Sequence, residues 1–583
     1  MTGKLINDPE NLIAELVEGM VSAHPHLLTV QGHTGRAIVA LHGPRAGKVG
    51  VVVGGGSGHE PAFAGYVGQG LADAAPLGNI FASPSPAHII DAGLAASGGA
   101  GVLFLYGNYT GDVMNFRMAE EEMAAQGILA RSFVTTDDIA SAPKDRIAER
   151  RGIAGNFFVF KAAGAAADLG GSLAEVEAAA KRANDATRTM GVALSACSMP
   201  QTNVPNFEIP EGQMEIGMGI HGEPGVARLP AESADAVTDR LILPILEELA
   251  VRAGDRVAVL VNGLGSTTLL ELYLLHRRVG HVLGQRDIAI HHSWVGNYCT
   301  SLEMGGASVT LLKLDADLTR WLDHPCETPA LTVAGHRPTP RAPRPNAYPI
   351  ATAAPPNIKP HSTPQRDLIE TGALTPERFR KMMRAGADAI FANRDPLCAL
   401  DGALGDGDHG ITMEIGWKAA TAALGGSPHA ATITELCDVT AQAFLDAVGA
   451  SAGPLYATAF RRAGAAVADR RNLDAAALVA WLYGMAQGIA TRGEAALGDK
   501  TMLDAWFPAA DAALLARAQS DSIATCLAAA ANGAAKGAEA TTQMQSNRGR
   551  SKKLGARSIG HKDPGAASAA ILLAAWAEAA ADL

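Results

Sequence analysis

The stretch from Val49 to Pro61, VGVVVGGGSGHEP, decides the fold class of the first half of the chain. Its valines form a short β-branched run, typical of a strand buried on both faces of a sheet, and the run passes directly into glycines. Similar runs at 101–106 and 256–262 also end at a glycine, and a further run lies at 308–312. Because helical patterns separate these runs, the sequence predicts an α/β domain whose ligand site lies in loops at the carboxyl ends of its strands.

Length and composition limit the class of protein. A chain of 583 residues is too long for a single core and predicts two to four folding units. Hydrophobic residues make up 48% and charged residues 18%, which supplies enough apolar material for packed cores. The formal net charge of -11 disfavours nucleic acid as a partner. The 6 cysteines are far apart and form no CxxC pair, so we expect reduced thiols rather than a disulfide framework or a zinc site.

The ends of the sequence predict a cytoplasmic protein with no membrane partner. The first ten residues include Lys4, Asp8 and Glu10 and hold no apolar run that could serve as the core of a signal peptide. The alanine-rich stretch at 567–583 is short and is interrupted by Glu578 and Asp582, so we interpret it as a buried helix.

A proline-rich stretch between 338 and 364 marks a boundary between domains, because its prolines interrupt any hydrogen-bonded ladder. Downstream of it, segments such as 473–490 and 504–518 have helical periodicity and few strands are evident, which predicts an all-α domain. The predicted organisation is an α/β domain at 1–335, a semi-rigid linker at 336–365 and an all-α domain at 366–583.

Three glycine-flanked loops of the α/β domain carry polar side chains that could take part in catalysis: His59, Asp112 and His221. Each has an ordinary structural explanation when taken alone, as a tight turn, a helix cap or an exposed histidine. Three such loops in one α/β domain favour a functional site.

These loops resemble a known family. GGGSGHEPAFAGYVGQG at 54–70, GNYTGDVMNF at 107–116 and GMGIHGEPG at 217–225 are similar to the signature loops of the dihydroxyacetone kinases, and LINDPENLIAELVEGMVSAHP at 5–25 resembles the opening of that family. The resemblance covers the whole first domain. It implies a kinase domain of two α/β subdomains that binds a small hydroxyketone, and a homodimer formed through this domain.

The resemblance also implies roles for individual residues. His221 would attack the ketone carbonyl and hold the substrate as a covalent hemiaminal, while His59 and Asp112 act on the hydroxyl that receives phosphate. The chemistry is coherent, because a neutral imidazole can add to a carbonyl and a tethered ketone gains effective concentration. The residues expected to bind the substrate are Gly56, Ser57, Gly58 and Asn108.

Three positions depart from the family pattern. Phe63 stands where a second histidine is usual, Gly107 where several members have lysine, and Phe160 where histidine is common. We expect these changes to reshape the wall of the pocket, so that a four-carbon ketose such as erythrulose rivals dihydroxyacetone as the substrate.

In the second domain, DGALGDGDHG at 401–410 concentrates Asp401, Asp406 and Asp408 in one loop. Carboxylate oxygens are suitable ligands for Mg2+. The spacing does not fit an EF-hand, because glycine is missing at the sixth position. The alternative is an acidic turn exposed to water, which the alternation of aspartate with glycine disfavours.

Further glycine-rich loops at 449–456, 498–504 and 555–565 are explained either as interhelical turns or as phosphate-binding loops. In this order the four loops resemble the ATP-binding domain of the same kinases, an all-helical barrel in which three aspartates, here Asp401, Asp406 and Asp408, hold two Mg2+ ions. Ala452 departs from a usual serine, and Lys552 with Lys553 replaces a usual Ser-Tyr pair. The resemblance places the following residues around ATP: His409, Thr412, Ser451, Ala452, Gly493, Met502, Arg550, Asp563, Pro564 and Gly565.

The prediction from the whole chain is an ATP-dependent kinase that phosphorylates dihydroxyacetone or a tetrulose such as erythrulose. The fused helical domain favours ATP over a phosphoprotein as the donor, because relatives that use a phosphoprotein keep the two parts on separate chains. Two alternatives remain: a lyase that cyclises FAD at the same metal site, and a ligand-binding regulator. The three aspartates argue against the regulator.

Overall fold

The computed structural model describes residues 4–334, 373–405, 407–428, 431–468 and 470–581. The α/β part ends with the short hairpin of β13 (Cys326–Glu327) and β14 (Thr332–Val333), and the helical part begins with α9 (Pro376–Ala392). The predicted linker at 336–365, with the limits on either side of it, lies outside the described residues.

The first sheet is built around β3, whose eight residues are all buried. It has six strands in the order β1-β2-β4-β3-β5-β6, and β3 pairs in parallel with both β4 and β5. This is the arrangement expected from the valine run that continues into glycines. The strands are β1 (Leu28–Gln31), β2 (Ala37–Ala40), β3 (Gly50–Ser57), β4 (Ala74–Ile80), β5 (Val102–Gly107) and β6 (Ala130–Thr135). The helices of this subdomain are α1 (Leu12–Ala23), α2 (Pro86–Ala96), α3 (Thr110–Ala125), α4 (Asn156–Asp168) and α5 (Leu173–Asp185).

A second six-stranded sheet has the order β11-β10-β12-β7-β8-β9 and is mixed. Its central strand β10 pairs in parallel with the edge strand β11 and antiparallel with β12. The two sheets confirm an α/β domain of two subdomains. The strands are β7 (Thr187–Ser195), β8 (Gln213–Ile216), β9 (Ala227–Pro230), β10 (Arg256–Gly263), β11 (Ala289–Gly296) and β12 (Gly305–Lys313). The helices are α6 (Ala234–Glu248), α7 (Leu269–Gly284) and α8 (Ala316–Leu322).

The second part is all-helical, as predicted. Each long helix from α11 onward packs on its successor, and α17 returns to pack on α9, so the described helices close into a ring. Four tryptophans, Trp417, Trp481, Trp506 and Trp576, fill the centre and are fully buried. After α9 the helices are α10 (Arg394–Gly402), α11 (His409–Gly426), α12 (Ile433–Ala447), α13 (Ala452–Ala466), α14 (Ala475–Gly493), α15 (Leu503–Arg517), α16 (Ile523–Ala540) and α17 (Pro564–Ala579).

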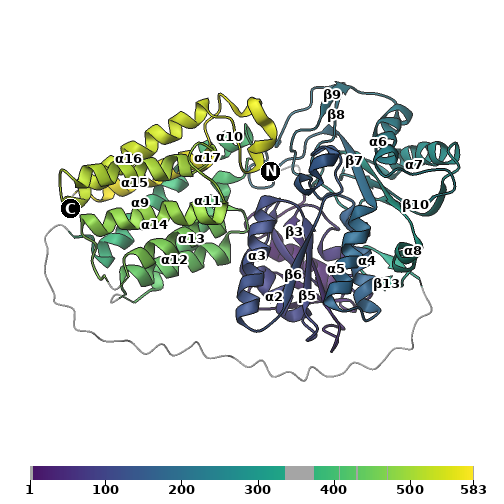
Figure 1. Ribbon diagram of the computed structural model, residues 1–583, viewed down its shortest axis with the longest axis horizontal. Coiled ribbons are helices and arrows are strands. Elements are labelled where there is room, and N and C mark those ends of the chain that lie inside the picture. Colours follow the sequence, from purple (N-terminus) through teal and green to yellow (C-terminus); the bar gives the residue numbers. More distant parts are fainter. Residues whose placement is uncertain (1–3, 335–372, 406, 429–430, 469, 582–583) are drawn as a thin grey trace.

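The two parts meet where α2 and α3 lie against α12 and α13 (Figure 1). Asn115 of α3 donates a hydrogen bond to the backbone oxygen of Gly449, and Met118 of the same helix joins the hydrophobic core of the helical part. At the rim of this contact, Arg492 lies 3.3 Å from Glu121. The glycine-rich loop before α13 therefore touches the α/β part directly.

A bilayer crossing requires about 20 consecutive apolar residues. None of the helices in the described ranges meets that requirement.

Candidate active site

Two of the predicted histidines meet in the α/β part. His59 follows β3, and His221 lies in the loop between β8 and β9. Their Nε2 atoms are 3.1 Å apart, and both side chains are buried. The structure thus brings together two loops that are 162 residues apart in the sequence.

The hydrogen-bond partners of this pair assign its protons. Nδ1 of His59 lies 2.8 Å from the carbonyl oxygen of Thr300 and must donate to it. Nδ1 of His221 lies 3.2 Å from Oε1 of Glu223 and donates to that carboxylate. The two Nε2 atoms then need one shared proton, because two bare lone pairs at hydrogen-bond distance would repel each other. The pair therefore carries one positive charge, which the carboxylate of Glu223 balances.

A chain of buried charges extends from Glu223 into the protein. Arg151 lies 3.8 Å from Oε2 of Glu223, 2.7 Å from Asp138, and donates to the backbone oxygen of Gly217 at 3.0 Å. Burial alone would lower the pKa of Arg151, but the Asp138 and Glu223 carboxylates outweigh it and raise that pKa. The guanidinium thus stays charged and fixes the carboxylate that holds His221.

Aromatic rings enclose the two imidazoles. Phe81 stacks on His59 with ring centroids 5.0 Å apart, and Tyr109 meets His221 edge-on at 4.7 Å. Phe81 has a φ of 58°, which is rare for a bulky residue and marks local backbone strain of the kind found at functional sites. The hydroxyl of Tyr109 is buried and has no hydrogen-bond partner within the described ranges, so a ligand oxygen could satisfy it.

Burial shapes the titration of these groups. Burial, and after it the charge of His221, lowers the pKa of His59 from 6.5 to about 3. Burial likewise raises the pKa of Tyr109 well above its ordinary value. At neutral pH His59 is therefore a neutral acceptor and Tyr109 a neutral donor.

The other predicted residues of the α/β part differ in whether their side chains are already hydrogen-bonded within the fold. Asp112 is buried in the first turn of α3. Ser57 donates its hydroxyl to Gly78 at 2.8 Å, and Asn108 donates its amide to the backbone oxygens of Ala148 and Arg150, so both side chains already serve the fold.

The neighbouring glycines allow close backbone contacts. A Cβ at Gly56 would lie 2.7 Å from the backbone nitrogen of Ala82. Gly58 has a φ of 96° and donates its N–H to the carboxylate of Glu60. The residues expected at the substrate thus offer backbone rather than side-chain contacts in this loop.

The three departures from the family pattern differ in their distance from the histidines. Phe63 is edge-on to His59 at 6.4 Å, whereas Phe160 packs behind Phe63 at 6.1 Å and is fully buried. A Cβ at Gly107 would lie 2.9 Å from the ring of Tyr109 and 3.0 Å from a backbone oxygen. The missing side chain at Gly107 therefore makes room for the tyrosine beside His221.

The acidic loop of the helical part lies at the start of α11. Oδ2 of Asp401 accepts the backbone N–H groups of Asp408 and His409 at 3.0 and 3.2 Å, while Asp406 lies outside the described residues. Oδ2 of Asp408 is buried without a hydrogen-bond partner among the described residues. Burial, and after it the charge of Asp401, raises the pKa of Asp408 to about 8. A buried carboxylate oxygen with no donor fits a divalent cation, so the residues present are suitable for Mg2+.

Asp563 caps α17 and accepts the N–H of Ala566 at 2.8 Å. Burial, and after it the charges of Asp504 and Asp401, raises its pKa to about 7. Nε2 of His409 lies 2.9 Å from the hydroxyl of Ser568 in the same helix. Pro564 is the first residue of α17, and Gly565 packs on Met502. The start of α17 is thus brought next to the acidic loop and to Met502.

Lys500 was not predicted as a site residue. Its buried ammonium donates to the backbone oxygens of Thr541, Met544, Ser558 and His561 at 2.6–3.2 Å. This single side chain holds together the loop that precedes α17. The sequence gives no signal for it, because its partners are backbone carbonyls.

The remaining predicted nucleotide residues lie at helix ends. Ser451 and Ala452 begin α13, and Gly493 ends α14 against the side chain of Leu455. Arg550 begins a 3-10 turn, and its side chain is not among the described parts of the structure. Lys552, one of the departures from the family pattern in this domain, lies 3.9 Å from Glu149 of the α/β part.

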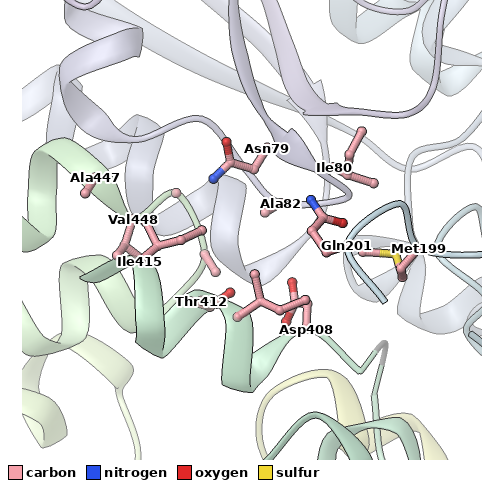
Figure 2. A pocket seen from close by; sticks show the side chains of 13 residues that line it. Asn79, Ile80, Ala82, Met199, Gln201, Asp408, Thr412, Ile415, Ala447 and Val448 are labelled. Carbon is pink, nitrogen blue, oxygen red and sulfur yellow. The ribbon is translucent and has the colours of Figure 1, made fainter. Parts of the chain in front are cut away.

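Residues of both parts line one small cavity between them, of about 30 Å³ (Figure 2). Asp408, the N-cap residue of α11, and Thr412 of that helix line it, together with Gly449 of the loop before α13. Asn79 and Gln201 reach it from the α/β part. The acidic loop and the phosphate-loop candidate therefore face the α/β part across a narrow gap.

Comparison with known proteins follows this division of the chain. A family model described as the Dak1 domain matches residues 18–330, and one described as the DAK2 domain matches residues 403–578. The L-erythrulose kinase of Pectobacterium atrosepticum is 37% identical over 580 residues, which is 98% of this chain and 95% of the relative. The chain belongs to the dihydroxyacetone kinase family. It is therefore a kinase.

Other members of the family match over nearly the whole length. The D-erythrulose kinase of Mycolicibacterium smegmatis is 38% identical over 577 residues, covering 97% of both chains. The crystal structure of the dihydroxyacetone kinase from C. freundii in complex with AMP-PNP and Mg2+ is 29% identical. It covers 99% of this chain and 100% of its own, with a TM-score of 0.52.

Proposed function

We propose that this kinase transfers the γ-phosphate of ATP to a hydroxyl of a four-carbon ketose of the erythrulose type while the ketose is bound covalently to His221. The observation that carries the proposal is the contact between the Nε2 atoms of His59 and His221, next to the ring of Tyr109, whose hydroxyl has no hydrogen-bond partner in the described part of the chain. A nucleophile and a proton acceptor thus lie within hydrogen-bond distance of each other, and the ring that carries a further donor packs against His221.

In the first step, Nε2 of His221 passes the shared proton to Nε2 of His59, whose Nδ1 stays bonded to Thr300. The freed lone pair attacks the carbonyl carbon of the ketose, and the carbonyl π pair moves to the oxygen. That oxygen takes the proton now held on Nε2 of His59 and becomes the hydroxyl of a hemiaminal, which leaves His59 neutral and the positive charge on the substituted imidazole of His221, opposite Glu223. Glu223 holds Nδ1 of His221 and so orients the ring throughout.

In the second step, a terminal hydroxyl of the bound ketose attacks the γ-phosphorus, and ADP leaves. Asp112 accepts the proton of that hydroxyl from the first turn of α3. The carrier of the phosphate lies close, because the contact between Asn115 of α3 and Gly449 brings the loop before α13 to the same helix. Tethering reduces the reaction to a transfer between two held groups.

The helical part binds the nucleotide in this proposal. Asp401, Asp406 and Asp408 would hold Mg2+, which supplies positive charge to the transferring phosphoryl group. The backbone N–H groups of Ser451 and Ala452, at the start of α13, are suited to phosphate oxygens. The complex of the C. freundii enzyme with AMP-PNP and Mg2+ supports ATP with Mg2+ as the donor.

Two features support erythrulose as the substrate class. Relatives that match nearly the whole chain are named L- and D-erythrulose kinases. In addition, the wall beside His221 is formed by the rings of Phe81 and Tyr109, with Gly107 leaving room for the latter. Such a wall accepts an additional carbon without requiring a matching charge.

A coupled assay of ADP formation tests the proposal. With saturating Mg-ATP, we expect kcat/KM to be highest for one enantiomer of erythrulose, lower for dihydroxyacetone, and negligible for glycerol, which has no carbonyl. A crystal soaked with that ketose should show continuous density between Nε2 of His221 and the substrate carbon. Equal turnover of glycerol, or a well-occupied complex without that bond, contradicts the proposal.

The same protein should be incubated with FAD in parallel, because a cyclase would use the same metal site. If AMP is released and a cyclic flavin phosphate forms while no ketose is phosphorylated, the proposed ketose substrate is wrong and the lyase alternative is favoured. The two activities are separated by His221→Ala, which removes the covalent tether and leaves the helical part intact.

A further inference from the structure

A cluster of three metal-ligating side chains lies at the edge of the second sheet. His291 and His292 belong to the edge strand β11, and Asp323 follows α8. Nε2 of His291 is 2.9 Å from Oδ1 of Asp323, and Nε2 of His292 is 3.2 Å from the same oxygen. One ligand atom from each residue lies within 4.8 Å of the others. None of these residues belongs to the kinase machinery.

We propose that His291, His292 and Asp323 form a binding site for a divalent transition-metal ion of the Zn2+ class. Two imidazoles and one carboxylate are the ligands that zinc uses in proteins. The set differs in kind from the all-oxygen acidic loop of the helical part, which suits Mg2+.

A β-bulge is what brings the two histidines together. Neighbouring residues of a regular strand point to opposite faces, so His291 and His292 should diverge. In the pairing of β10 with β11, Val257 aligns with Ile290 but the next residue, Ala258, aligns with His292, and His291 is the additional residue. A bulge in a parallel pair is uncommon, and bulges re-aim side chains near functional sites.

The flanking residues show which face the cluster occupies. Ser293 points toward α7, where its hydroxyl lies 2.8 Å from Nε2 of His276. Trp294 points to the opposite face and packs against Phe157 of α4. The ring of His292 lies 5.1 Å from that of Trp294, so the cluster is on the α4 face of the sheet, where α8 ends.

The distances between the ligand atoms are close to those of a zinc site. Zinc bonds of about 2.0–2.1 Å in a tetrahedron place ligand atoms about 3.3 Å apart. The two distances to Asp323 are within a few tenths of an ångström of that value. The side chains of His292 and Asp323 are 44% and 43% exposed, so water can complete the shell. His324 is not a fourth ligand, because its Nε2 lies 2.7 Å from Asp168.

The expected consequence is structural. An ion at this position would join the end of α8 to the edge strand of the sheet, which Asp323 already links through its hydrogen bond to His291 and its contact with His292. Because it binds only the folded arrangement, it should stabilise the first domain by mass action.

Cobalt(II) is the probe for the test, since it substitutes for Zn2+ and absorbs visible light in a tetrahedral site. Full-length protein is stripped with a chelator and titrated with Co2+ in excess Mg2+, which occupies the all-oxygen site. We expect one equivalent of Co2+ with tetrahedral d–d bands and partial quenching of tryptophan fluorescence through Trp294. Zn2+ should displace the bands and raise the Tm.

Asp323→Asn is the main variant, because it removes the charge and keeps the shape; His291→Ala is the second. Both should lose the bands and the Zn2+-dependent rise in Tm while keeping the kinase activity of the wild type. His276→Ala is the matched control, since it removes a neighbouring histidine outside the cluster, and it should retain both signals. The proposal is overturned if wild type shows no stoichiometric binding, or if all three variants behave alike.

Discussion

Glu223 offers a sharp test of how His221 is prepared for attack. Its two carboxylate oxygens accept hydrogen bonds from Nδ1 and from the backbone N–H of His221 at 3.2 and 3.0 Å, and Arg151 lies 3.8 Å away. Glu223→Gln keeps the shape but removes the charge and replaces one acceptor with a donor. Glu223 acts as a positioning residue, through the imidazole that it holds.

The magnitude follows from these contacts. Hydrogen bonds to a charged group contribute about 1.5–3 kcal/mol and those between neutral groups about 0.5–1.5 kcal/mol, so neutralising two of them costs about 2–3 kcal/mol. If that cost falls on the transition state, kcat/KM for the ketose decreases about 30- to 150-fold. KM for ATP should not change, since Glu223 is in the α/β part.

Glu215→Gln is the matched control. Glu215 holds the other end of the same loop through Gly225 at 2.9 Å and Arg228 at 2.8 Å, without touching a histidine. We expect it to affect the Tm more than kcat/KM. The alkaline limb of the kcat/KM profile should move to lower pH in Glu223→Gln only, because the histidine pair loses its counter-ion. A decrease of less than about fivefold, or equal effects of the two variants, refutes the argument.

Substitutions at four other positions have distinct expected outcomes. Asp408→Asn should abolish ADP release yet raise the Tm in Mg2+-free buffer near neutral pH, because it removes a buried carboxylate oxygen that has no partner among the described residues; added Mg2+ should raise the Tm of the wild type only. The pKa of His59 is lowered from 6.5 to about 3, so acid favours the unfolded chain, which takes up the proton first. Lowering the pH from about 7 to 5 should therefore reduce the unfolding free energy of the first domain by about 2 kcal/mol. Urea denaturation at these two pH values should show a smaller reduction in His59→Asn. Tyr109→Phe should lower kcat/KM for the ketose about 2- to 12-fold with KM for ATP unchanged, the range for one hydrogen bond. Lys500→Met should raise KM for ATP and lower the urea midpoint of the helical part, because four backbone carbonyls lose their donor.

Much of the fold could be predicted from local pattern. The run at 49–53 begins one residue before β3 and continues into it, and the segments at 473–490 and 504–518 coincide closely with α14 and α15. The mixed pairing of the second sheet was not predicted. Strand direction there is set by connections between distant elements, such as the antiparallel alignment of β12 with β7, for which a single sequence carries no signal.

The site divides in the same way. His59 and His221 stand in glycine-flanked loops and were predicted, but their mutual contact depends on folding. Glu223 is two residues after His221 within the loop GMGIHGEPG, so its charge was a usable signal that the sequence analysis did not exploit. Arg151 could not be found in this way, because its role depends on complete burial beside carboxylates that are distant in the sequence. The carbonyl of Thr300 has no signature at all, since every residue offers one.

The proposed mechanism suits ketoses of different length. In it the site recognises two chemical features: a carbonyl next to His221 and a hydroxyl next to Asp112. Between them the wall is formed by rings, Phe81 and Tyr109, which offer area rather than a fixed set of hydrogen bonds. If the ketose is tethered as proposed, affinity comes from the covalent bond, and discrimination between ketoses depends on the residues that set the position of those rings. Gly107 is the most direct of these, because any side chain there must displace Tyr109. Gly107→Ala should therefore change the ratio of kcat/KM between erythrulose and dihydroxyacetone more than it changes KM for ATP. An unchanged ratio in the coupled assay would show that the position of these rings does not determine specificity.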